Sequence, residues 1–458
     1  MAIALELASF CTGLKFPQLP PEVVDRAKSL FLDFIGVASR GSLATSSKSI
    51  YRFIRERGKG RGVLIGTKDR APFTYACLAN GTAGHAIEMD DVNNESSLHP
   101  GVVIFPTALA TAEMTGASGR RLIEAVVAGY EVMVRLGKGL GPSGCYRRGF
   151  HPTAICGTFG SSVTASKLLG LGASRMASAM GISGSQAAGS MEFLAEGAWT
   201  KRFHAGWAAH SGMIAAMLSQ KGFRGPASII EGRDGFLHAY SDHSDSHRVL
   251  EGLGSGFEIL RTSVKPHACC RYMQPPIDGL LKIMAEEDLV PEEIERVKLG
   301  LLSAGFRLIA EPPDRKYAPQ TPVDAQFSMP FGAAVAILYR RAGLREFQPS
   351  KMKSDRVRAL MRKVECTVDP ELDRAYPRQW GATAEILTRD GRRYLRKIEY
   401  PKGDPENPLS WEELIEKFDD LSGPLLSRER RRRIVEEVRG LEKIEDMGRW
   451  SILLLKDR

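Results

Sequence analysis

Apolar residues at helical spacing dominate the first half of the chain. Pro20-Pro21 begins one such segment, in which apolar side chains recur every three or four residues until about Gly41. Similar segments follow at residues 104–114, 122–136, 154–169 and 210–220. Their many small residues permit close helix packing, and the alternation that is typical of strands is rare. The pattern therefore predicts a helical domain that extends to about Arg224.

The pattern changes at about Lys265. It predicts helices at residues 276–285 and 351–362, and strands at residues 297–302, 363–368, 382–387 and 394–400. Asp390-Gly391, between the last two strands, is a strong hairpin-turn signal. This alternation predicts a mixed α+β domain, after which residues 411–455 return to helical periodicity. The expected fold class is mostly α, with a large all-helical domain and a smaller α+β domain.

Length and charge add two constraints. A chain of 458 residues is long for one compact domain and suggests two, and its 43% apolar and 26% charged residues are typical of a globular protein. The net charge is +9, but Lys and Arg are scattered, and no nucleic-acid-binding motif accompanies them. The one dense basic run, residues 428–433, follows the helix-capping Ser427 and is predicted to be a solvated helix face. We interpret the positive charge as matching an acidic small molecule and not a nucleic acid.

Cysteine usage and the apolar runs bear on the compartment. The seven cysteines are odd in number and irregularly spaced, so they do not predict a disulfide framework. Residues 1–7 lack a basic leader, and Glu6 interrupts any signal-like apolar core. The sequence has no apolar run long enough to span a bilayer. We expect a cytoplasmic protein that has no membrane partner.

The first concentration of chemical groups is the stretch from Gly84 to Gly101. An apolar, helix-like segment at residues 75–87 runs into three acids, Glu88, Asp90 and Asp91. The next apolar segment begins at His99-Pro100, where the proline suits the first turn of a helix and holds the histidine extended before it. An anionic substrate could be met there by both an imidazole and backbone N–H groups.

Two further clusters strengthen this interpretation. His151-Pro152 again precedes a run of small and apolar residues. Farther on, Lys201 and His204 would share one face of a helix. His85, by contrast, is interpreted as a packed or capping histidine. Acids, imidazoles and ammonium groups in an otherwise apolar, glycine-rich half are the pattern expected of a site that handles carboxylates.

These motifs and several later ones, taken in order, resemble the MmgE/PrpD family, which includes 2-methylcitrate dehydratases, cis-aconitate decarboxylases and iminodisuccinate epimerases. The matching stretches are residues 85–91 with 99–101, 149–153, 201–206, 222–226 with 231–232, 265–270 and 326–331. The resemblance implies a large helical domain, formed by residues 1–264 and 403–458, which is interrupted by a smaller α+β lid domain at residues 265–402. It also implies a homodimer and an active site at the seam between the domains.

The family pattern places catalytic residues at Asp91, His99, His151, Lys201 and Lys265. We add a second set as substrate-binding candidates: Glu88, His204 and Cys270. Removing a proton beside a carboxylate builds charge on that group, which the two lysines would stabilise. The histidines at 99 and 151 are the expected acid and base, in an order that the sequence leaves open, and the aspartate would orient or tune one imidazole. The expected substrate is a small di- or tricarboxylate.

Several departures from the family pattern bear on which reaction is expected. Glu88 stands where decarboxylase-like members have Asp, Phe331 occupies the place of a tyrosine, and Gln274 replaces a histidine. These departures favour a dehydratase of a hydroxylated substrate such as 2-methylcitrate. Residues 201–206, in contrast, resemble the decarboxylase and epimerase branch more closely. A cis-aconitate decarboxylase-like enzyme, an epimerase of an iminodisuccinate-like substrate and a catalytically inactive binding protein are the alternatives.

Neither a metal nor another cofactor is predicted. His243 and His247 are four residues apart, but the serines and aspartates between them make a poor helix, so a solvated loop is expected in place of a zinc site. The glycines at residues 139–141 and 170–172 do not form the strand-Gly-x-Gly-x-x-Gly-helix unit of a nucleotide site.

Overall fold

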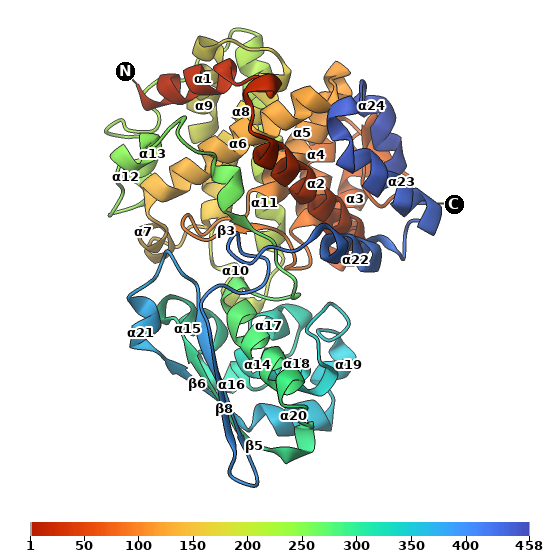
Figure 1. The fold of residues 1–458 in the computed structure, drawn as a ribbon. Helices are drawn as coiled ribbons and strands as arrows, with labels where there is room; N and C mark the ends of the chain where they lie inside the picture. The colour runs from red at the N-terminus through yellow and green to blue at the C-terminus, as the bar shows by residue number, and fades with distance from the viewer. Residues whose placement is uncertain (1, 458) are drawn as a thin grey trace. The chain divides into compact units, whose positions relative to one another are not determined.

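The computed structural model describes residues 2–457, which form two compact units. One unit comprises residues 2–262 together with 410–457, and the other comprises residues 263–409. The first is mostly helical, and the second combines helices with a four-stranded sheet (Figure 1). The predicted fold class is therefore confirmed. Within residues 2–457, no helix is both long enough and apolar enough to cross a membrane.

The first unit contains the helices that the sequence predicts, but the predicted segment 210–220 is only the second half of a helix that begins at Thr200. Its helices are α1 (Ile3–Gly13), α2 (Pro21–Gly41), α3 (Thr45–Arg55), α4 (Phe73–Gly84), α5 (Gly101–Thr115), α6 (Gly119–Leu140), α7 (Pro142–Arg147), α8 (Pro152–Leu168), α9 (Ala173–Gly184), α10 (Phe193–Glu196), α11 (Thr200–Gln220), α12 (Phe236–Tyr240), α13 (His247–Leu250), α22 (Trp411–Ser422), α23 (Arg428–Arg439) and α24 (Met447–Trp450). Three two-residue strands accompany them: β1 (Gly62–Val63), β2 (Arg70–Ala71) and β3 (Val92–Asn93). Helix α22 packs against α2, so the C-terminal segment returns to the helical unit.

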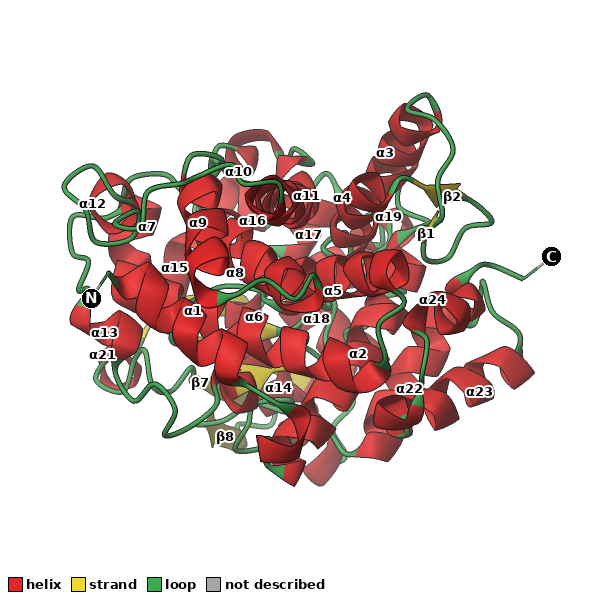
Figure 2. Cartoon of the chain, turned by 90° about the horizontal axis from the view of Figure 1, so that it is seen from above, coloured by secondary structure: helices red, strands yellow, loops and turns green. Residues whose placement is uncertain are grey.

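Helix α8 forms the centre of this unit. It packs against α5, α6, α9 and α11, as Figure 2 shows, and nearly all its residues are buried. The neighbouring pair α4 and α11 is held close by two glycines. A Cβ on Gly206 would lie 2.2 Å from the carbonyl oxygen of Leu78, and a Cβ on Gly81 would lie 2.8 Å from the Cα of Gly206. Because only glycine permits this approach, it sets where the first turns of α11 lie beside the end of α4.

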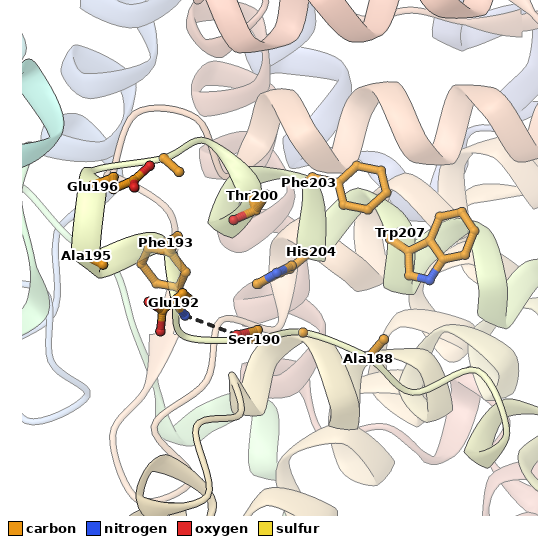
Figure 3. A pocket seen from close by; sticks show the side chains of 12 residues that line it. Ala188, Ser190, Glu192, Phe193, Ala195, Glu196, Thr200, Phe203, His204 and Trp207 are labelled. Atoms are coloured by element: carbon orange, nitrogen blue, oxygen red, sulfur yellow. Dashed lines mark hydrogen bonds between the residues drawn. The ribbon is translucent and has the colours of Figure 1, made fainter.

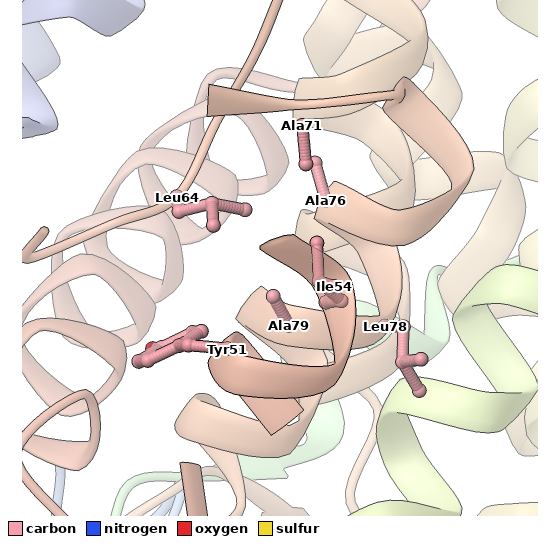
Figure 4. Packing of buried hydrophobic residues seen from close by; sticks show 7 residues of the cluster. All are labelled: Tyr51, Ile54, Leu64, Ala71, Ala76, Leu78 and Ala79. Atoms are coloured by element: carbon pink, nitrogen blue, oxygen red, sulfur yellow. The ribbon is translucent and has the colours of Figure 1, made fainter. Parts of the chain in front are cut away.

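A smaller apolar cluster anchors α3 to the outside of α4. Its buried members come from α3, from the short strands β1 and β2 with their flanks, and from α4, as Figure 4 shows: Tyr51, Ile54, Leu64, Ala71, Ala76, Leu78 and Ala79. Removing these side chains from water stabilises the start of α4. This contact fixes one side of the helix that leads into residues 85–91.

The second unit is built on a sheet with the strand order β6-β5-β7-β8. Its strands are β5 (Ile294–Leu301), β6 (Val364–Val368), β7 (Ala382–Thr388) and β8 (Arg393–Ile398), and its helices are α14 (Gln274–Glu286), α15 (Ser303–Ile309), α16 (Pro313–Lys316), α17 (Pro322–Gln326), α18 (Met329–Tyr339), α19 (Pro349–Met352), α20 (Asp355–Met361) and α21 (Pro370–Asp373). Strands β5 and β6 are parallel, whereas the β5–β7 and β7–β8 pairs are antiparallel. The predicted hairpin turns at Asp390-Gly391, where the glycine has a φ of 86°.

One predicted helix of this unit is wrong. Residues 351–362 do not form a single helix, because Ser354 takes an extended conformation and begins a second one. Serine is favoured at such a helix start because its side chain competes with the backbone for hydrogen bonds inside a helix.

Candidate active site

Residues 85–91 form a buried turn segment between α4 and β3. The sequence predicts helix up to Ile87, but α4 ends at Gly84, and His85 occupies the position after the last helical residue. Glu88 adopts a left-handed backbone conformation with a φ of 58°, which costs about 1–3 kcal/mol for a residue with a side chain. Side-chain contacts hold this segment in place. They involve four of the predicted site residues: Glu88, Asp91, His99 and Lys201.

Asp90 lies between two imidazoles. One of its carboxylate oxygens is 2.8 Å from Nδ1 of His85 and 2.9 Å from Nδ1 of His99. Nδ1 of His99 is also 2.8 Å from the backbone oxygen of Asp91. Since both neighbours of this nitrogen are acceptors, Nδ1 carries the proton and the lone pair of the neutral His99 ring is on Nε2. The carboxylate also stabilises the imidazolium form of this ring, so His99 can both accept and donate a proton.

Asp91 has a different role from the one that the sequence suggested. Its carboxylate does not contact an imidazole. One oxygen accepts from the backbone N–H of Gly101 at 2.8 Å, at the start of α5, and the other accepts from the hydroxyl of Tyr130 at 2.5 Å. Burial raises the pKa of Asp91 to about 7, and the two hydrogen bonds partly oppose that rise. The prediction that the Asp91 carboxylate orients an imidazole is therefore wrong. The carboxylate that contacts the imidazoles is that of Asp90.

The second His-Pro start lies beside the first. Thr153, in the first turn of α8, accepts a hydrogen bond from the backbone N–H of His99 at 3.1 Å. The ring of His85 is 5.0 Å from that of His99 and 5.8 Å from that of His151, measured between centroids. The two predicted acid–base residues therefore flank a third, fully buried histidine, which sequence reasoning treated as packing.

His151 also contacts His204. Their Nδ1 atoms are 3.2 Å apart, so one ring donates and the other accepts. Burial lowers the pKa of His151 well below its ordinary value, and the cationic forms of His204, His85, Lys201 and His99 lower it further. Burial likewise lowers the pKa of His204 to about 4. Both rings are neutral at pH 7.

Lys201 forms a buried ion pair with Glu88. Lys201 and His204 both lie in α11, as the prediction that they share one face of a helix requires, and the lysine is in its first turn. The left-handed backbone at Glu88 turns the Glu88 carboxylate toward Lys201. A carboxylate that is already paired with this ammonium group is poorly suited to bind an anionic substrate. We therefore interpret Glu88 as a residue that positions Lys201.

Replacing Glu88 with Gln is expected to destabilise the protein by about 3 kcal/mol, because it leaves the buried ammonium of Lys201 without its counter-charge. Chemical denaturation measures the change. The matched control is Glu292→Gln, whose partner Arg356 and whose own side chain are 71% and 68% exposed, and it should cost less than about 1 kcal/mol. Equal costs for the two variants would mean that the Glu88–Lys201 pair does not act as a buried pair.

The C-terminal helices of the same unit support this segment. Lys417 of α22 donates to the backbone oxygen of Met89 at 2.8 Å and pairs with the buried Asp33 of α2 at 2.6 Å. This contact joins three distant parts of the chain at the turn that carries Glu88 and Asp90. Residues from both ends of the sequence therefore help to hold this turn in place.

Two predicted site residues, Lys265 and Cys270, lie in the second unit. Both are buried, in the stretch between β4 (Thr262–Ser263) and α14. Gln274 closes this stretch with its side-chain amide, which donates to the backbone oxygens of His267 and Cys269 at 3.1 Å each. The residue that replaces a family histidine thus has a structural role here.

Metal binding must be considered at one place in the part of the chain that the structure describes. The nitrogens of His85 and His99 and the carboxylate of Asp90 all lie within 4.8 Å of one another. The separations of 2.8 and 2.9 Å are those of hydrogen bonds in which Asp90 accepts from both rings. His243 is exposed in the loop before α13, as predicted, whereas His247, which is also exposed, is the first residue of α13.

Dialysis against a chelator is therefore expected to leave turnover unchanged, because Nδ1 of His85 and Nδ1 of His99 already form hydrogen bonds with the carboxylate of Asp90. Steady-state rates before and after treatment measure the effect. A loss that added Zn²⁺ or Mn²⁺ restores would show that these atoms hold an ion.

Sequence reasoning missed two residues of this cluster. Asp90 is adjacent to the expected Asp91, and the sequence alone does not say which of two neighbouring carboxylates turns toward the histidines. Tyr130 lies inside an apolar helix, where a buried tyrosine gives no local signal of a hydrogen bond to a site residue. Together the cluster offers a proton-carrying imidazole, a buried cation and neutral donors, which suit proton transfer beside a carboxylate.

The chain matches known proteins over nearly its whole length. Residues 5–248 match the MmgE/PrpD N-terminal domain, and residues 267–443 match the MmgE/PrpD C-terminal domain. The chain belongs to the MmgE/PrpD family, whose members are enzymes.

Curated relatives resemble the chain from end to end. The cis-aconitate decarboxylase-like protein oryM of Aspergillus oryzae is 28% identical, with 99% of this chain and 97% of that protein aligned. A cis-aconitate decarboxylase of Aspergillus terreus is 25% identical, with 97% and 94% aligned, and that of Homo sapiens is 27% identical, with 99% and 94% aligned.

Proposed function

We propose that this protein is a lyase that decarboxylates a cis-aconitate-like unsaturated tricarboxylate. The observation that carries the proposal is the full-length similarity to proteins named as cis-aconitate decarboxylases. The departures from the family pattern favour a dehydratase, whereas the relatives described above are named as cis-aconitate decarboxylases or as decarboxylase-like. The buried cluster around Asp90 and Lys201 offers the groups that such a decarboxylation needs.

The proposed step begins with the cleavage of a carbon–carbon bond. Loss of carbon dioxide leaves an electron pair, which spreads over the adjacent double bond and a remaining carboxylate. Lys201, in a buried site, stabilises the charge on that carboxylate as it forms. The imidazolium form of His99, stabilised by Asp90, then delivers one proton to carbon. The sum is one proton consumed and one carbon dioxide released.

A dehydratase is the second candidate, and two residues of the second unit favour it. Phe331 is fully buried and packs against Phe347, so it provides no hydroxyl where decarboxylase-like members have one. Gln274 uses its amide on backbone oxygens. In a dehydration His99 takes the proton from carbon through Nε2, and a second group protonates the departing hydroxyl. An epimerase would use the same imidazoles on opposite faces of one carbon.

Three further features are proposed because the chain resembles the family. Lys265 and Cys270 are proposed members of the site, with Lys265 as a second cation. The two compact units are proposed to be the two domains expected from the sequence. The protein is proposed to be a cytoplasmic homodimer. Sedimentation of the purified protein would measure the number of subunits.

One experiment distinguishes the reactions. The protein is incubated in D₂O with cis-aconitate, 2-methylcitrate, citrate and iminodisuccinate separately, and each mixture is followed by ¹H and ¹³C NMR. The proposal expects loss of carbon dioxide from cis-aconitate, with one deuterium on carbon in the product. Loss of a hydroxyl group from either citrate would establish the dehydratase instead, and deuterium exchange with inversion of iminodisuccinate would establish the epimerase.

A further inference from the structure

A cavity of about 550 Å³ opens on one side of the histidine cluster, within the helical unit. It lies between the segment of residues 188–198, which includes α10, and the first half of α11. Figure 3 shows His204 projecting from α11 towards Phe193 and Ser190 on the other wall. His204 belongs to both the cavity lining and the cluster, because its Nδ1 contacts His151.

His151 is enclosed on the side of this cavity. His151 is only 3% exposed, and its backbone N–H donates to the backbone oxygen of Gly189 at 2.9 Å. Phe193 packs against both imidazoles, with ring centroids 6.2 Å from His151 and 6.1 Å from His204. The described contacts of the His151 ring on this side are therefore to Phe193, which transfers no proton, and to His204, which can.

The charge of the cavity argues against passage of the substrate. Glu192 and Glu196 line it, together with apolar side chains such as Phe203 and Trp207. Two carboxylates disfavour the entry of a polycarboxylate by like-charge repulsion, whereas they do not hinder water or a proton. The cavity is thus better suited to water than to the acid on which the enzyme is proposed to act.

We infer that His204 relays protons between His151 and water in this cavity. The inference rests on the proposed function, because it supplies a proton path for that site. The proposed decarboxylation consumes one proton, so the relay is needed in the direction from water to the site. His204 takes a proton from water at Nε2 and passes the proton on its Nδ1 to Nδ1 of His151, and His151 releases its Nε2 proton to the site. One proton enters and one leaves, so both rings are neutral before and after, and the reverse sequence removes a proton from the site.

The test compares His204→Gln with His210→Gln. Glutamine retains a hydrogen-bonding side chain beside His151 but cannot take up a proton and release another. His210 is the matched control, because it is a mostly buried histidine of the same helix whose Nδ1 contacts the backbone oxygen of Thr74 at 2.9 Å and not His151. In dilute buffer, kcat of the His204 variant should fall about tenfold at unchanged KM, and added imidazole should restore it. The control and the wild type should not respond to imidazole.

A second measurement needs no substrate. In ¹⁵N NMR spectra, exchange of the His151 ring N–H with water should slow about tenfold in His204→Gln and not in His210→Gln. Unchanged exchange, or a loss of kcat that imidazole does not restore, overturns the relay. If the wild type does not decarboxylate cis-aconitate, the proposed function fails, and the exchange measurement still decides whether His204 carries protons. If His204→Gln does not fold, His204→Asn takes its place in both measurements.

Discussion

Replacing Lys201 with Met is expected to lower kcat by about 10²- to 10³-fold, which is the loss seen when one group that stabilises a developing anion is removed. The ammonium is buried in the cluster, where water does not replace its charge. Methionine keeps most of the side-chain volume without the positive charge. Steady-state kinetics with the substrate identified by NMR measure the effect.

The difficulty with this variant is that it also leaves Glu88 buried without a partner. The double variant Glu88→Gln/Lys201→Met removes both charges, so it should recover stability relative to Lys201→Met while turnover stays low. If turnover recovers together with stability, Lys201 is only structural, and the proposed stabilisation of the substrate carboxylate by Lys201 fails.

The second large effect is expected at His99. Substitution by Asn places an amide N–H where Nδ1 of the imidazole lies, so the contacts with Asp90 and the backbone oxygen of Asp91 can persist. It removes Nε2, the atom proposed to hold the transferred proton. A loss of about 10²- to 10⁴-fold in kcat is expected, the usual contribution of a general acid or base. Thermal unfolding should change little by comparison.

Asp90→Asn provides an independent check on the same atom. An amide cannot favour the Nδ1–H form of His99 as a carboxylate does, and it cannot stabilise the imidazolium. We expect a loss of activity comparable to that of His99→Asn. His243→Asn, in the exposed loop before α13, is the control and should retain full activity. Activity that survives in His99→Asn would assign the proton transfer to another group.

The helices and the hairpin were predictable because local rules govern them. Pro21 begins α2 and Gly41 ends it, and Asp390-Gly391 turns β7 into β8, as the sequence indicated. The end of α4 was not predictable from periodicity. Residues 85–87 continue the apolar pattern, but a contact five residues ahead, from His85 to Asp90, and an ion pair with a distant helix set the backbone there. Such tertiary contacts leave no periodic signal.

The candidate site was predictable in its residue types and only partly in its contacts. The two His-Pro starts pointed to helix N-termini, and His151 directly precedes α8 with Pro152 as its first residue. The exchange of roles between Asp90 and Asp91 depends on Gly101. A Cβ there would lie 2.8 Å from both carboxylate oxygens of Asp91, so the glycine allows that carboxylate to approach the start of α5 and leaves Asp90 to the imidazoles. The lysine at 265 lies in the other unit, and its place in the site stays a prediction.

The measurement that tests the central claim most directly is a crystal structure with a saturated tricarboxylate bound, one that has neither the double bond nor the hydroxyl group on which the enzyme would act. We predict one carboxylate about 2.8 Å from Nζ of Lys201, with the carbon beside it facing Nε2 of His99. If the saturated tricarboxylate inhibits competitively but binds away from Lys201 and His99, the account is contradicted.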